Sequence, residues 1–122
     1  MQIPILKQGK FLIVSIQTII SDHDLLSLKN DLSTMVGENR SRGVIIDVTT
    51  LDVMDSFSTR TLRNIAYTVK LRGAETIIVG IQPDVAFAMI QLGLKLDDVT
   101  TALNLEEGLM LLNKLEASYD RK

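Results

Sequence analysis

The sequence predicts an α/β fold in which a mostly parallel sheet is opened by an antiparallel hairpin. Two continuous β-branched runs, Val44–Ile46 and Ile77–Val79, are typical of strands covered on both faces, as the strands of a parallel sheet are. Amphipathic helical patterns separate the later strands, and such alternation requires right-handed crossover connections. Only Lys7 to Lys10, with Gly9 among them, separate the first two strands, which is typical of a hairpin.

Five segments are expected to form the sheet, each a short run rich in Ile, Val, Leu or Thr. The predicted strands are Ile3–Leu6, Phe11–Ile16, Gly43–Val48, Thr76–Ile81 and a short fifth strand near Val99–Leu103. With the helices between them, the predicted order of elements is ββαβαβαβα.

Four helices are expected, and each carries a residue that favours a helix end. These residues are Ser21 or Asp22 as the cap of the first helix, Gly73 at the end of the second, Pro83 and Gly93 at the start and end of the third, and Asn104 with Glu107 as a capping box for the fourth. Leu25 and Leu28 begin the apolar stripe of the first helix, and Leu62 and Ile65 that of the second.

Composition places the chain among intracellular globular domains. It has 122 residues, of which 46% are apolar, so we expect residues 1–122 to form a single domain with a sizeable core. The net charge of −2 comes without a basic run, which argues against nucleic acid as a partner. The absence of Cys and of a signal peptide favours the cytoplasm, and no apolar run reaches the roughly 18 residues of a membrane span.

No pattern in the chain predicts an enzyme, a metal site or a cofactor. His23 lies between Asp22 and Asp24, but the chain has no nucleophile-elbow serine for it to serve, and we interpret it as a surface residue. One histidine and scattered carboxylates do not form a zinc-type site, and the isolated glycines form no phosphate loop. A nucleotide-binding or hydrolytic domain that uses the strand-end loops remains the least favoured alternative.

Asp47 lies at the end of the third strand and Asp52 in the loop beyond it, where open α/β sheets place their sites. A phosphoacceptor aspartate of the response-regulator kind would need an acidic pair after an earlier strand, but the residues after Ile16 carry no charge until Asp22. We therefore interpret Asp47 and Asp52 as residues that form turns and solvate the loop.

The segment from Leu51 to Thr59 connects a buried strand to an amphipathic helix, and its hydroxyl residues fall where that helix begins. Asp55 or Ser56 is expected to be the N-cap. A hydroxyl at a helix N-terminus is also a favourable place for a phosphate, because the free N–H groups and the helix dipole stabilise its negative charge. The neighbouring Asp55 would repel that charge, so phosphorylation should change the surface potential greatly and the fold little.

These segments resemble the STAS domain, the family named for sulfate transporters and anti-sigma factor antagonists. The resemblance covers the hairpin, the Gly43–Asp47 strand, the Met54-Asp55-Ser56 turn and the later segments 79–83 and 103–106. It is greatest to the stand-alone, RsbS-like stressosome members, whose signatures resemble segments 3–7, 14–17, 55–57 and 80–83.

The resemblance implies a non-catalytic scaffold of the stressosome. Such members assemble with RsbR-type co-antagonists and with copies of themselves, hold an RsbT-type switch kinase, and release it when that kinase phosphorylates them. A phosphatase of the RsbX type resets the complex. The phosphorylated serine of the family carries over to Ser56, with Ser58 and Thr59 as rivals, and Asp55, Phe57 and Arg60 are the expected partner contacts.

One departure from the family pattern bears on a second function. Direct anti-sigma factor antagonists of the family usually read Asp-Ser-(Ser/Thr)-Gly in this turn, whereas here Phe57 and Ser58 take the third and fourth places. This departure weighs against a direct antagonist controlled by serine phosphorylation, which is the alternative to the scaffold. Phe57 either offers an apolar contact next to the switch residue or packs into the core.

Overall fold

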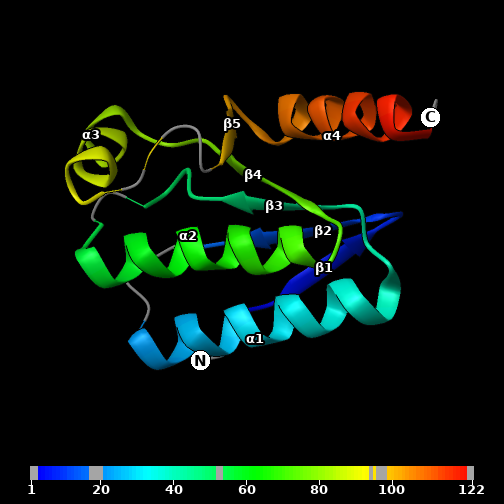
Figure 1. The fold of residues 1–122 in the computed structure, drawn as a ribbon. Coiled ribbons are helices and arrows are strands. Elements are labelled where there is room, and N and C mark those ends of the chain that lie inside the picture. Colours follow the sequence, from blue (N-terminus) through cyan, green and yellow to red (C-terminus); the bar gives the residue numbers. More distant parts are fainter. Residues whose placement is uncertain (1–2, 17–20, 52–53, 94, 96–98, 121–122) are drawn as a thin grey trace.

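The computed structural model describes residues 3–16, 21–51, 54–93, 95 and 99–120. Its elements follow the predicted order ββαβαβαβα (Figure 1). Their bounds are β1 Ile5–Gln8, β2 Phe11–Ser15, α1 Asp22–Asn39, β3 Gly43–Asp47, α2 Ser56–Leu71, β4 Glu75–Val79, α3 Pro83–Gln91, β5 Thr100–Ala102 and α4 Leu105–Asp120. None of the helices formed by these residues is long and apolar enough to cross a bilayer.

The sheet has the predicted mixture of directions. Its order is β1-β2-β3-β4-β5, with β1 antiparallel to β2 and the remaining neighbours parallel. The first strand lies two residues later than predicted, because the ladder continues to Gln8, opposite Phe11, and leaves Gly9 and Lys10 as a two-residue turn. Gly9 has a φ of +59°, which such a tight turn favours.

Helices cover the two faces of the sheet unequally. The helices α1 and α2 lie side by side on one face, and α4 lies on the other (Figure 1). Side chains alternate between the faces along each strand: Val44 and Ile46 pack with α1 and α2, whereas Ile45 packs with Leu112 of α4. All of these side chains are buried, which explains why the run Val44–Ile46 is apolar without interruption.

The predicted helix caps are formed. Ser21 accepts a hydrogen bond from the N–H of Asp24 at 3.1 Å at the start of α1. Asn104 accepts from the N–H of Glu107 at 2.9 Å before α4, while the Glu107 carboxylate accepts from the N–H of Leu103 at 3.3 Å. In the usual capping box the glutamate accepts from the N–H of the N-cap residue, whereas here it accepts from the residue before the N-cap. Gly73, just beyond α2, has the expected positive φ of +91°.

Candidate phosphorylation and partner-binding site

The segment between β3 and α2 begins with a closed turn at the carboxyl end of the parallel strands. The Oδ1 atom of Asp47 accepts hydrogen bonds from the N–H of Thr49 at 2.9 Å and from the Thr49 hydroxyl at 2.5 Å. Asp47 is therefore a turn-forming residue, as its position predicts. Asp52, for which the sequence predicts the same role, lies outside the described residues.

The same turn is fastened to the loop that follows β4. The Nε2 atom of Gln82 donates to the carbonyl oxygen of Thr49 at 2.9 Å. Gly80 has a φ of +75°, and its backbone lies so close to Thr49 that a Cβ atom at residue 80 would lie 3.1 Å from the Thr49 Cα and would overlap its hydroxyl. Sequence reasoning missed this contact, although a glycine placed directly after a strand and three residues before Pro83 was a signal for it.

Two apolar side chains anchor the rest of the segment to the core. Leu51 is 7% exposed and Met54 is 8% exposed, and both belong to the core that α1 and α2 cover. Because residue 54 is held inside and residue 55 is exposed, the start of α2 is presented at the surface at a fixed position.

Asp55 is the N-cap of α2, so of the two predicted candidates it is the aspartate that caps the helix. Its Oδ1 atom accepts a hydrogen bond from the N–H of Ser58 at 2.7 Å, and its backbone is extended. The pKa of the Asp55 carboxyl is lowered, first by this backbone N–H and then by the side chain of Ser58. The negative charge of Asp55 is therefore stabilised in the folded chain.

The three candidate hydroxyls have different surroundings. Ser56 is the first residue of α2 and is exposed. Ser58 is half-buried, and its side chain hydrogen-bonds Asp55. Thr59 is only 1% exposed, and its Oγ1 atom has no hydrogen-bond partner among the described residues. The geometry thus leaves Ser56 as the most accessible of the three hydroxyls and the one that the cap does not use.

Phe57 and Arg60, the two other predicted partner contacts, differ in how far they are exposed. Phe57 is half-buried and packs against the core beneath α2, so it contributes to the core and is not fully presented to a partner. Arg60 is exposed one turn after Ser56. Residues four positions apart on a helix are neighbours on its surface, so the guanidinium of Arg60 lies within reach of a group attached to Ser56.

The family follows from the sequence and the architecture together. The model of the STAS domain family matches residues 2–108, which includes the sheet, the Asp55 cap and the start of α4. The chain belongs to the STAS domain family. The described residues form a five-stranded sheet with an antiparallel first pair and four helices, which is the architecture that the resemblance implied.

Relatives of this STAS domain include stressosome proteins. An RsbS variant from Moorella thermoacetica has a TM-score of 0.87 and 33% identity, over 96% of this chain and 99% of that chain. A chain from a solved structure of the molecular architecture of the stressosome has a TM-score of 0.81 and 36% identity, over 93% of this chain and 98% of that chain. The RsbT co-antagonist protein RsbRA of Bacillus subtilis (strain 168) is 30% identical over 75% of this chain, which spans only 33% of RsbRA.

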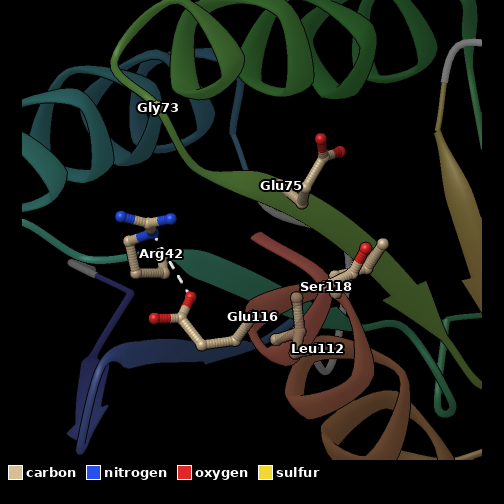
Figure 2. Close-up of a pocket in the computed structure, with 7 residues that line it drawn as sticks. Arg42, Gly73, Glu75, Leu112, Glu116 and Ser118 are labelled. Atoms are coloured by element: carbon tan, nitrogen blue, oxygen red, sulfur yellow. Dashed lines mark ion pairs between the residues drawn. The ribbon is translucent and has the colours of Figure 1, made fainter. Parts of the chain in front are cut away.

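A hollow of about 180 Å³ lies at the other end of this STAS domain, where β3 and β4 begin (Figure 2). Leu112 and Leu115 of α4 line it, and Glu116 lies 3.3 Å from Arg42 across it. This hollow is at the amino ends of the strands, whereas Ser56 follows the carboxyl end of β3. Among the described residues no group of three or more His, Cys, Asp or Glu side chains is placed to hold a metal ion.

The cap of this STAS domain gives a first stability prediction. Replacing Asp55 with alanine removes the acceptor for the Ser58 N–H and is expected to lower the free energy of unfolding by about 1 kcal/mol, measured by urea denaturation at pH 7. The pKa of Asp55 is lower in the folded chain than its unfolded value of about 3.9. Its contribution is therefore complete above that value and is lost as the pH falls through the folded-state pKa.

Ser56→Ala is the matched control, because the Ser56 hydroxyl takes no part in the cap. We expect its free energy of unfolding to stay within about 0.5 kcal/mol of the wild type. A larger loss for Ser56→Ala than for Asp55→Ala would contradict the assignment of Asp55 as the cap.

Proposed function

We propose that this STAS domain is a non-catalytic scaffold of a cytoplasmic stressosome. It assembles with RsbR-type co-antagonists and with further copies of itself, holds an RsbT-type switch kinase, and releases that kinase when Ser56 is phosphorylated. An RsbX-type phosphatase returns it to the kinase-binding state. Two similarities support the scaffold role. The chain is 33% identical to an RsbS over almost the whole of both chains, and it is 36% identical to a chain of the stressosome.

The observation that carries the switch is the position of Ser56. Its side chain is exposed on the first turn of α2, while the neighbouring Asp55 and Ser58 already form the cap. A kinase can therefore reach the Ser56 hydroxyl without opening the helix. In the reaction the Oγ atom of Ser56 forms a bond to the γ-phosphorus of ATP, the bond from that phosphorus to ADP breaks, and the hydroxyl proton is released.

The phosphate changes the surface more than the fold. It adds a charge of about −1.5 to −2 beside the Asp55 carboxylate, and the two groups repel each other. The N–H groups of the first turn and the helix dipole offset part of that repulsion. Because the cap bond from Ser58 to Asp55 does not involve Ser56, we expect α2 to persist while the local potential becomes strongly negative.

Sizing by light scattering tests the scaffold role. The purified chain is mixed with the STAS part of an RsbR-type co-antagonist and with an RsbT-type kinase, and the molar mass is measured before and after ATP is added. We expect a particle on the megadalton scale that binds the kinase and loses it when ATP is present. Each chain alone, run at the same concentration, is the control.

A small one-to-one complex with an anti-sigma factor, and no large particle with the co-antagonist, would favour the direct antagonist instead. The Phe57-Ser58 pair at the third and fourth places of the turn weighs against that alternative, because Phe57 is packed partly into the core.

A further inference from the structure

Charge is distributed unevenly among the helices. The sequence of α2 contains Arg60, Arg63 and Lys70 but no Asp or Glu. The neighbouring α1 contains four acidic residues and Lys29 as its single Lys or Arg, and α4 has the same balance with Lys114. Asp84 is the single charged residue in the sequence of α3. In a chain with a net charge of −2, the helix that begins at Ser56 is therefore the only basic one among the helices that the structure describes.

Exposed side chains lie along the outer side of α2. We call it the α2 basic face, and it consists of Arg60, Asn64, Tyr67, Lys70 and Leu71. Arg60, Asn64, Tyr67 and Leu71 recur at intervals of three or four, so they form one stripe along the helix, and Lys70 flanks it three residues after Tyr67. Tyr67 is 47% exposed and Leu71 is 89% exposed, which adds apolar area between and beyond the cations.

The cations of this helix are available to a partner. In the described part of the chain, no carboxylate forms an ion pair with Arg60, Arg63 or Lys70, whereas Lys10 and Arg42 both pair with Glu116 on the other side of the sheet. Exposed Tyr and Arg side chains are the residues that protein interfaces favour, and a stripe of one charge sign selects a partner of the opposite sign.

We infer that the α2 basic face docks an acidic surface of the switch kinase. This inference rests on the proposed function and names the surface that the kinase uses. The position of the stripe selects the kinase over other occupants: it begins one turn after Ser56, so an enzyme that reaches the Ser56 hydroxyl lies against it. The partner surface is expected to be rich in Asp and Glu, with an apolar patch opposite Tyr67 and Leu71.

The same geometry explains how a phosphate would release the kinase. A phosphate on Ser56 lies four residues before Arg60, and an anion placed N-terminal to a cation at this spacing is the favourable order on a helix. The guanidinium then pairs with the phosphate within the chain, and the phosphate also repels the acidic surface of the kinase. Phosphorylation therefore withdraws the first cation of the stripe and reverses the charge at its end.

Kinase binding by charge-reversed variants tests the inference. Affinity of the purified full-length chain for the kinase is measured by calorimetry with a non-hydrolysable ATP analogue, so that Ser56 stays unmodified. We expect Arg60→Glu and Lys70→Glu each to lower the affinity by about fivefold or more, and the wild-type affinity to fall as salt is raised. Arg60→Lys keeps the charge and should stay within about twofold of the wild type.

Lys114→Glu is the matched control, because it makes the same change in net charge on exposed α4, across the sheet from α2. We expect it to change the affinity by less than about twofold. In the Arg60→Ala background, Ser56→Asp should lower the affinity by a smaller factor than in the wild type, because the cation that the acidic group would neutralise is missing.

The outcomes separate the inference from the proposed function. If the wild-type chain binds the kinase and is phosphorylated, but Arg60→Glu and Lys114→Glu have equal effects, the inference alone is wrong. The same holds if the reversals weaken self-association or co-antagonist binding and leave the kinase affinity unchanged. If the wild-type chain does not bind the kinase, the proposed function and the inference fail together.

Discussion

Replacing Ser56 with alanine is expected to abolish phosphoryl transfer to this chain and to leave the switch kinase bound after ATP is added. The reason is geometric: Ser56 is the exposed hydroxyl at the start of α2, and no other hydroxyl of that turn is both accessible and unused by the cap. Mass spectrometry after incubation with kinase and ATP measures the modification, and a pull-down measures the retained kinase. Ser56→Asp should bind the kinase about tenfold more weakly.

Two neighbouring variants control this result. Thr59→Val keeps the shape of the buried side chain and removes a hydroxyl that has no described partner, so phosphorylation should be unchanged. Ser58→Ala removes one hydrogen bond to Asp55 and should also leave the modification in place. If Ser56→Ala is phosphorylated as fully as the wild type, Ser56 is not the phosphorylated residue. If phosphorylation is lost in Thr59→Val, the buried threonine is the modified residue instead.

Gly80→Ala is expected to be the most destabilising single-atom change in the site. The glycine has a φ of +75°, which costs a non-glycine residue about 1–2 kcal/mol. The added Cβ would also overlap the Thr49 hydroxyl and lie 3.1 Å from the Thr49 Cα, so side-chain rotation alone cannot relieve the overlap. We expect a loss of about 3 kcal/mol in the free energy of unfolding, measured by urea denaturation.

Gly9→Ala separates the two causes. Gly9 has a φ of +59°, but a Cβ atom there would meet nothing within 4 Å. Gly9→Ala should therefore lower the free energy of unfolding only by the cost of placing alanine at a positive φ, about 1 kcal/mol. If Gly80→Ala lowers the free energy of unfolding by no more than Gly9→Ala does, the close approach to Thr49 adds nothing to the loss. Because the Thr49 turn leads into α2, Gly80→Ala should also slow phosphorylation of Ser56.

The parts of the fold that the sequence predicted are those encoded by short-range patterns. Val44–Ile46 and Ile77–Val79 are buried from both sides, so their apolar runs identify them as strands without knowledge of what covers them. Ser21 and Asn104 act on backbone N–H groups three residues away, which a linear reading detects. The edge strand β1 was placed less well, because its limits depend on pairing with β2 and only Ile5 of its residues is half-buried.

The candidate site was predicted in its position but not in its detail. The pattern placed Ser56, Ser58 and Thr59 together at a helix start, and it could not say which hydroxyl faces solvent. That answer depends on how α2 packs against the core, which buries Thr59 and leaves Ser56 outside. The bond from Gln82 to Thr49 joins residues 33 apart in the chain, and no local spacing predicts such a contact.

The order of the strands has a consequence for how the chain folds. Since every strand that the structure describes lies beside the one that precedes it in the sequence, none of these strands is inserted between two that are already paired. Each new strand can join the free edge of the sheet as soon as its own crossover helix has formed. Loop-closure entropy is kept small at each step, because the two ends of each connection are close in the chain. The nascent protein can therefore build its sheet in the order in which the ribosome delivers it.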